Sequence, residues 1–165
     1  KNEKPINIYS DFATSRYLKK TFNYCFKSFS REYPATLKLN KLNKNTFIKD
    51  CNKKIKVKAV KVEHGNVQSI CYIIDKKLAY ISDVSKIYKK DHTHFRNLKY
   101  LIIDCLWYNY HPSHFNLEKS LQMIDLFNPK RAILTNLHSD LDFNKLKKLL
   151  PKNVEPAYDG LSLRL

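Results

Sequence analysis

Four apolar, β-branched segments of this chain are each followed at once by a side chain that can bind a metal ion or transfer a proton. The segments are KIKVKAVKV before Glu63-His64, KLAYIS before Asp83, YLIIDCLWY before His111 and His114, and RAILTNL before His138. Such segments are typical of strands, and strand ends that gather at one sheet edge hold functional loops on a rigid scaffold. The recurrence predicts an active site at one edge of a sheet.

Apolar runs predict strands along the whole chain. Their ranges are 6–9, 37–42, 46–48, 55–62, 69–74, 78–81, 101–107, 131–137 and 161–165. The range 101–107 is apolar throughout except for Asp104, which is typical of a central strand. Asp75-Lys76-Lys77 joins two apolar runs and predicts a hairpin turn, although the turn has no glycine.

Three helices alternate with these strands. They are predicted to begin near Ala13, Leu117 and Phe143, each after a residue whose side chain can accept a hydrogen bond from the first helical N–H groups. The capping residues are Ser10 or Asp11 for the first helix, Asn116 for the second and Asp142 for the third. The order predicts an α/β fold (α+β by some schemes) with a mixed sheet flanked by helices, in a single domain over residues 1–165.

Composition leaves nucleic-acid binding open and argues against a membrane protein. The formal charge is +16, but few of the 31 basic residues are arginine, the side chain best suited to reading phosphate and guanine. No apolar run is long enough to span a bilayer. The four cysteines show no C-x-x-C spacing, so we expect a protein of the reducing cytoplasm.

At the level of motifs the chain resembles a known family. VEHGN, YISDVS, HPSHFNLEKSLQMID, AILTNLHSDLD and VEPAYDGLSL follow one another with the order and spacing of metallo-β-lactamase-fold hydrolases. The branch that they resemble is similar to the phosphonate-pathway cyclic phosphodiesterase. The family's H-x-H-x-D-H motif does not occur in these residues, and the chain begins at Lys1. We therefore expect the C-terminal two-thirds of an αββα metallo-β-lactamase sandwich.

The resemblance implies a metal site. His64 matches a ligand of the first divalent ion, Zn or Mn, and Asp83 matches the carboxylate that bridges two ions. The second ion takes a late histidine, for which the sequence offers His138, because Asn136 stands at the position where the family's histidine falls. Imidazole is a better ligand than an amide for these ions, so His138 is preferred over Asn136.

The resemblance also implies a catalytic group and its supporting residues. His114 matches a histidine that assists the substrate phosphate or protonates the leaving alkoxide, and His111 is the alternative. Glu63, Asp104 and Asp159 are expected to orient imidazoles, although Asp104 also fits a buried polar group of a strand. The pair His92 and His94 is not assigned to a metal, because no D-H follows it.

The activity implied for the intact protein is hydrolysis of a small phosphodiester by a hydroxide held between two metal ions, with catalytic roles for Asp83 and His114. The alternatives are a nuclease of the tRNA-processing type and a non-catalytic module that binds nucleic acid or a partner. With only His64, Asp83 and His138 as ligands, this chain is expected to bind no metal, or one ion weakly, and to be inactive. Exposed apolar surface and unpaired strand edges near 6–9 and 55–62 favour self-association.

Overall fold

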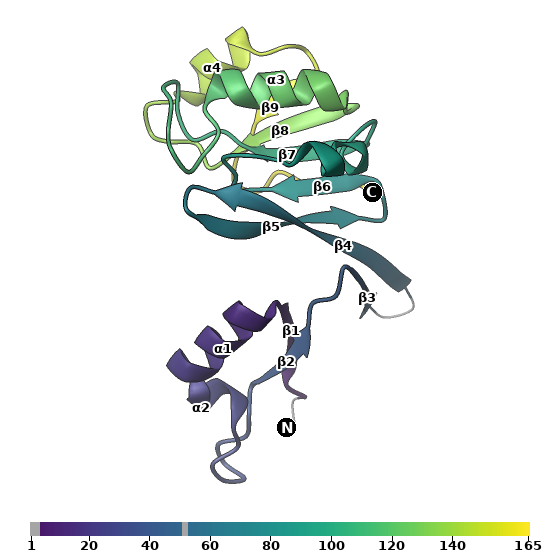
Figure 1. Ribbon diagram of the computed structural model, residues 1–165, viewed down its shortest axis with the longest axis vertical. Helices are drawn as coiled ribbons and strands as arrows, with labels where there is room; N and C mark the ends of the chain where they lie inside the picture. The colour runs from purple at the N-terminus through teal and green to yellow at the C-terminus, as the bar shows by residue number, and fades with distance from the viewer. Residues whose placement is uncertain (1–3, 51–52) are drawn as a thin grey trace. The chain divides into compact units, whose positions relative to one another are not determined.

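The computed structural model describes residues 4–50 and 53–165. These residues form two compact units, a first that ends at Thr46 and a second that begins at Phe47 (Figure 1). The single domain over residues 1–165 stays a prediction.

The first unit is a small pair of strands with two helices. Its elements are β1 (Ile6–Ser10), α1 (Phe12–Thr21), α2 (Asn23–Phe26) and β2 (Leu37–Lys41), and β1 pairs with β2 in parallel. Asp11 is the residue that caps α1, because its carboxylate accepts a hydrogen bond of 2.8 Å from the backbone N–H of Thr14.

The first unit leaves many apolar side chains in solvent. The buried hydrophobic core of the described residues lies in the second unit, with members from Val57 to Val154. Large apolar side chains of the first unit are exposed, namely Ile6, Phe12, Tyr17, Phe22, Tyr24, Phe29 and Tyr33. Self-association, which depends on such surface, stays a prediction.

The second unit is built on a mixed sheet of seven strands. The strand order is β3-β4-β5-β6-β7-β8-β9. The strands are β3 (Asn45–Asp50), β4 (Lys53–His64), β5 (Val67–Ile74), β6 (Leu78–Ile81), β7 (Tyr100–Asp104), β8 (Arg131–Thr135) and β9 (Val154–Pro156). This sheet with its helices confirms the predicted fold class.

The strand directions bring four strand ends to one edge of the sheet. β5 is antiparallel to both β4 and β6, so β4 and β6 run in the same direction. β6, β7, β8 and β9 are mutually parallel. The carboxyl ends of β4, β6, β7 and β8 therefore share the edge at which the sequence predicted an active site.

Helices pack against the parallel part of the sheet. α3 (Leu117–Phe127) contacts β7, and α4 (Phe143–Leu149) contacts β9 (Figure 1). A short 3-10 helix, η1 (Lys89–His94), lies between β6 and β7 in sequence. Asn116 and Asp142 cap α3 and α4 as predicted, with hydrogen bonds of 3.0 and 2.8 Å from the N–H groups three residues later. No helix in the described parts of the chain is long and apolar enough to cross a bilayer.

Three strand predictions were wrong in detail. The last strand is β9, Val154–Pro156, and residues 161–165 form none, because no described strand pairs with them. β7 ends at Asp104, and the chain turns away to form the loop that precedes α3. β4 lies between β3 and β5, so the edge predicted at 55–62 has β3 as a neighbour, although β3 is too short to pair with all of that segment.

The predicted hairpin between β5 and β6 is confirmed. The N–H of Lys77 donates to the carbonyl of Ile74 at 2.9 Å, and the two residues between them, Asp75 and Lys76, have φ of 49° and 55°. Positive φ at both central positions suits the right-handed twist of a hairpin, but it strains residues that carry a Cβ.

We expect Lys76→Gly to raise the free energy of unfolding by about 0.5–1 kcal/mol, because glycine adopts positive φ without that strain. Urea denaturation measures the change. The control is Lys77→Gly, in the same turn but without positive φ, which should lower stability. A loss of stability in the Lys76 variant would contradict the strain argument.

Candidate metal centre

Three of the predicted site residues meet at the shared sheet edge. His64 ends β4, Asp83 follows β6, and His114 lies in the loop between β7 and α3. Each offers one ligand atom, and the three atoms all lie within 4.8 Å of one another. The rings of His64 and His114 are 4.6 Å apart between centroids. Two imidazoles and a carboxylate at this spacing fit a divalent ion that prefers nitrogen and oxygen ligands.

His64 is held by the backbone of the loop that carries His114. Its Nδ1 donates a hydrogen bond of 2.7 Å to the carbonyl oxygen of Ser113. A carbonyl can only accept, so the proton lies on Nδ1 and the lone pair on Nε2. Nε2 is therefore available as a metal ligand.

Asp83 is exposed at the edge of the sheet and is held by two serines. The hydroxyl of Ser82 donates to its carboxylate at 2.9 Å, and the hydroxyl of Ser69 donates to its backbone carbonyl at 2.6 Å. The second bond comes from β5, so the position of Asp83 is fixed by a neighbouring strand.

His114 is oriented by the buried carboxylate of Asp104. Asp104 is 0% exposed, and its Oδ2 accepts from Nδ1 of His114 at 2.8 Å. The same oxygen accepts from the backbone N–H groups of Val84 at 3.2 Å and Phe115 at 3.3 Å. These N–H groups can only donate, so the oxygen is an acceptor and the lone pair of His114 lies on Nε2. Asp104 therefore contacts an imidazole as the sequence predicted.

Burial dominates the ionisation of Asp104. It raises the pKa of the carboxyl above the ordinary value of an aspartate, and the hydrogen bonds from His114, Val84 and Asn136 oppose that rise. A buried carboxylate with several donors is stabilised only while the donors stay in place.

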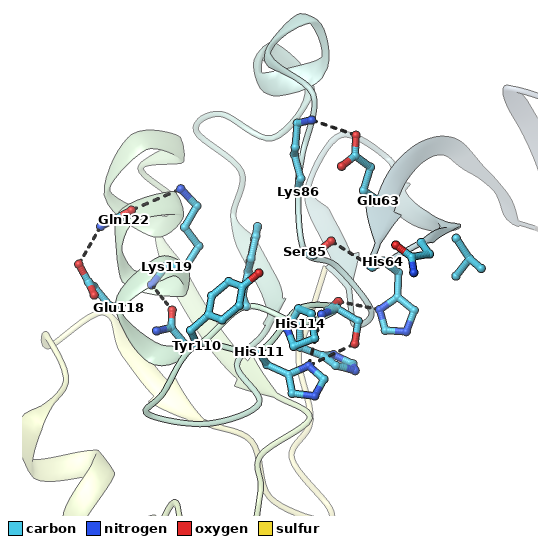
Figure 2. A pocket seen from close by; sticks show the side chains of 17 residues that line it. Glu63, His64, Ser85, Lys86, Tyr110, His111, His114, Glu118, Lys119 and Gln122 are labelled. Carbon is cyan, nitrogen blue, oxygen red and sulfur yellow. Dashed lines mark hydrogen bonds and ion pairs between the residues drawn. The ribbon is translucent and has the colours of Figure 1, made fainter.

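A cavity of about 890 Å³ opens beside the histidines, between the end of β4 and the start of α3. Figure 2 shows His64, His111 and His114 together on its wall, with Lys86 and Lys119 also lining it. Glu63 pairs with Lys86 at 3.0 Å, and this hydrogen bond lowers the pKa of Glu63 below its ordinary value. The partner found for Glu63 is thus a lysine and not the predicted imidazole.

The structure does not bring the late histidine into the group of three. The ring of His138 lies beside Trp107, with centroids 5.8 Å apart, and its Nδ1 accepts from the N–H of Asp140 at 3.3 Å. Asn136 lies nearer the group, because its amide nitrogen donates to the carbonyl of Ser82 and, at 3.2 Å, to Asp104. The ligand roles of His138 and Asn136 stay predictions.

The remaining predicted site residues are Asp159 and His111. Asp159 is exposed in a turn near the C-terminus, and its role as an orienting group stays a prediction. His111 lines the cavity, and its ring centroid is 5.3 Å from that of His114.

Ser113 is the site residue that the sequence reasoning missed. It contacts His64 through its backbone, and backbone contacts leave no signal in residue type. The available signal was its place in H-P-S-H, between the two predicted site histidines.

The geometry fits a metal centre at the edge of a mixed sheet, and the comparisons identify the family. Residues 1–136 match the beta-lactamase superfamily domain, so the chain belongs to that family. It has the metallo-β-lactamase fold, as its motifs predicted. Among curated proteins, none has a matching sequence.

Solved structures agree on the fold. A diphosphatase from the PhnP family has a TM-score of 0.82 and 25% identity, over 96% of this chain and 57% of that chain. Human tRNase Z, short form, has a TM-score of 0.62 and 14% identity, over 97% of this chain and 66% of its own. Zn(2+)-bound PqqB from Methylobacterium extorquens has a TM-score of 0.75 and 13% identity, over 98% and 66%. This chain thus spans 57% of the length of the diphosphatase.

We expect Asp104→Asn to lower the free energy of unfolding by about 1–3 kcal/mol, because the amide cannot accept from all the donors that face the carboxylate. The control is Asp140→Asn, the same change at an exposed aspartate beside His138, where we expect about 0.5 kcal/mol or less. Urea denaturation of both variants measures the difference. Equal effects would show that the Asp104 network does not stabilise the fold.

Proposed function

We propose that the protein is a metal-dependent hydrolase of small phosphodiesters that uses two divalent ions, Zn or Mn. The observation that carries the proposal is the group of His64, Asp83 and His114, whose ligand atoms lie within 4.8 Å of one another. The likeness to a diphosphatase at 25% identity supports phosphorus chemistry.

The donor atoms of this chain fit the ions. His64 would hold one ion through Nε2, and the carboxylate of Asp83 would bridge two, which offsets their mutual repulsion. Bound ions supply Lewis acidity and a nucleophile at neutral pH. The chain's own residues would orient the substrate in the adjoining cavity, where Lys119 and Lys86 line the wall.

For His114 we propose a role on the substrate. Asp104 holds its Nδ1, so the doubly protonated ring would donate the proton on Nε2 to the leaving oxygen and return to the tautomer with a lone pair on Nε2. The same Nε2 lone pair could ligate an ion, so the geometry leaves two roles that the experiments below separate.

In the complete gene product, we expect Asp83→Ala to abolish metal loading and activity together, because the carboxylate is the proposed bridge. Elemental analysis of the purified protein measures metal, and hydrolysis of bis(p-nitrophenyl) phosphate measures activity. Ser82→Ala is the matched control, since it removes only the hydroxyl that contacts the carboxylate. Unchanged metal content in the Asp83 variant would refute the bridge.

We expect His114→Ala to keep nearly all of the metal and to lower turnover by about 10²- to 10⁴-fold, the usual effect of losing a general acid or base. His94→Ala, in η1, is the control and should retain turnover. Loss of metal in the His114 variant would make His114 a ligand. His138→Ala, measured in the same way, tests the proposed late ligand.

The residues of this chain alone should bind at most one Zn²⁺, weakly, because three ligands leave open positions and do not hold two ions. Calorimetric titration of the 165-residue chain gives the stoichiometry. Tight binding of two ions would show that further ligands lie within these residues.

Faster cleavage of RNA than of the small diester by the complete gene product would favour the nuclease alternative.

A further inference from the structure

One residue of the loop before α3 contacts two different imidazoles of the cavity. The carbonyl oxygen of Ser113 lies 2.7 Å from Nδ1 of His64. The backbone N–H of the same residue lies 3.3 Å from Nδ1 of His111, and its hydroxyl lies 3.2 Å from that atom. Ser113 thus presents an acceptor to one ring and donors to the other.

These contacts require opposite tautomers. Nδ1 of His64 must carry a proton, because the carbonyl that it faces can only accept. Nδ1 of His111 must carry the lone pair, because the backbone N–H that it faces can only donate. A neutral imidazole has one proton, so His64 presents a lone pair on Nε2 and His111 presents an N–H there.

We propose that Ser113 is a positioning residue that assigns these opposite tautomers, so that His64 accepts a metal ion while His111 donates a hydrogen bond to an anionic oxygen of the substrate. The substrate role rests on the proposed function, since it assumes a phosphoryl oxygen in the cavity. The ring of His111 lies on the cavity wall beside His114, which suits this donor role (Figure 2).

The close approach of Ser113 to the end of β4 depends on Gly65. This glycine has φ of 58°, and a Cβ built on it would lie 3.0 Å from Cβ and 3.5 Å from Cα of Ser113. A side chain there would push the Ser113 peptide away from His64. A substitution at Gly65 can thus disturb the contact between Ser113 and His64 without changing any histidine.

The test is a direct measurement of tautomers in the metal-free chain. Long-range ¹H–¹⁵N spectra of histidine-labelled protein distinguish the protonated from the unprotonated ring nitrogen. They are recorded at about pH 8.5, above the ordinary imidazole pKa of about 6.5. We expect the proton of His64 on Nδ1 and that of His111 on Nε2, with signals assigned by His64→Gln and His111→Gln. The same tautomer in both rings would overturn the proposal.

Two glycine variants test the cause. Gly65→Ala should release His64 from its single tautomer and give averaged nitrogen shifts. Gly160→Ala is the matched control, because Gly160 also has positive φ, 90°, but has nothing within 4 Å of an added Cβ. Ser113→Ala keeps the backbone contacts and should keep both tautomers. An unchanged His64 signal in folded Gly65→Ala would overturn the positioning role, and if that variant does not fold, the wild-type spectra still decide the tautomers.

Inorganic phosphate is the probe for the donor role. We expect phosphate to shift the Nε2 signal of His111, and His111→Phe to weaken phosphate binding about tenfold, the effect of losing one hydrogen bond to a charged group. His94→Phe, in η1 and outside the lining of the cavity, should leave phosphate binding unchanged. Equal affinities in the wild type and the His111 variant would refute the donor role. The tautomers do not depend on activity, so the failure of the proposed hydrolase function would be seen separately.

Discussion

The buried carboxylate of Asp104 is the interaction on which the arrangement of the site depends. It receives hydrogen bonds from Val84 after β6, from His114 and Phe115 after β7, and from Asn136 after β8. A carboxylate that is removed from water is stabilised only by such donors. The Asp104 carboxylate therefore holds together the loops that follow the parallel strands β6, β7 and β8. Asp83 precedes Val84 directly, and its position is therefore linked to that of His114.

Much of this edge could be predicted from the sequence, because alternation of strands and helices fixes which strand ends are neighbours. Parallel neighbours put the ends of β6, β7 and β8 together, and the hairpin through β5 returns β4 in the same direction. His64, Asp83 and His114 could be singled out since each follows an apolar run. Asp104 could be singled out as the polar residue of an apolar strand, and burial there requires a partner.

The placement of the two candidates for the late ligand, Asn136 and His138, could not be predicted, because it depends on the backbone of the loop after β8. Asn136 has φ of 60°, a left-handed conformation that redirects the chain within one residue. Its amide is turned toward Asp104, and two residues later the ring of His138 lies beside Trp107. Asn136 therefore contacts the site, whereas His138, only two positions later, lies outside the group of three. The residue type at position 136 does not reveal its positive φ. Ser113 was missed for a related reason, since its contact with His64 is made by the backbone.

The hydrogen bonds that orient the candidate ligands are made within the protein, and this affects how a metal site of this kind forms. Ser113 fixes the proton of His64, Asp104 fixes that of His114, and Ser82 and Ser69 hold Asp83. The lone pairs of both imidazoles and the carboxylate are therefore aimed by hydrogen bonds within the fold. Ligands that are ordered by the fold lose less conformational entropy when an ion binds, so the ligand spacing is a property of the sheet edge and its three linked loops.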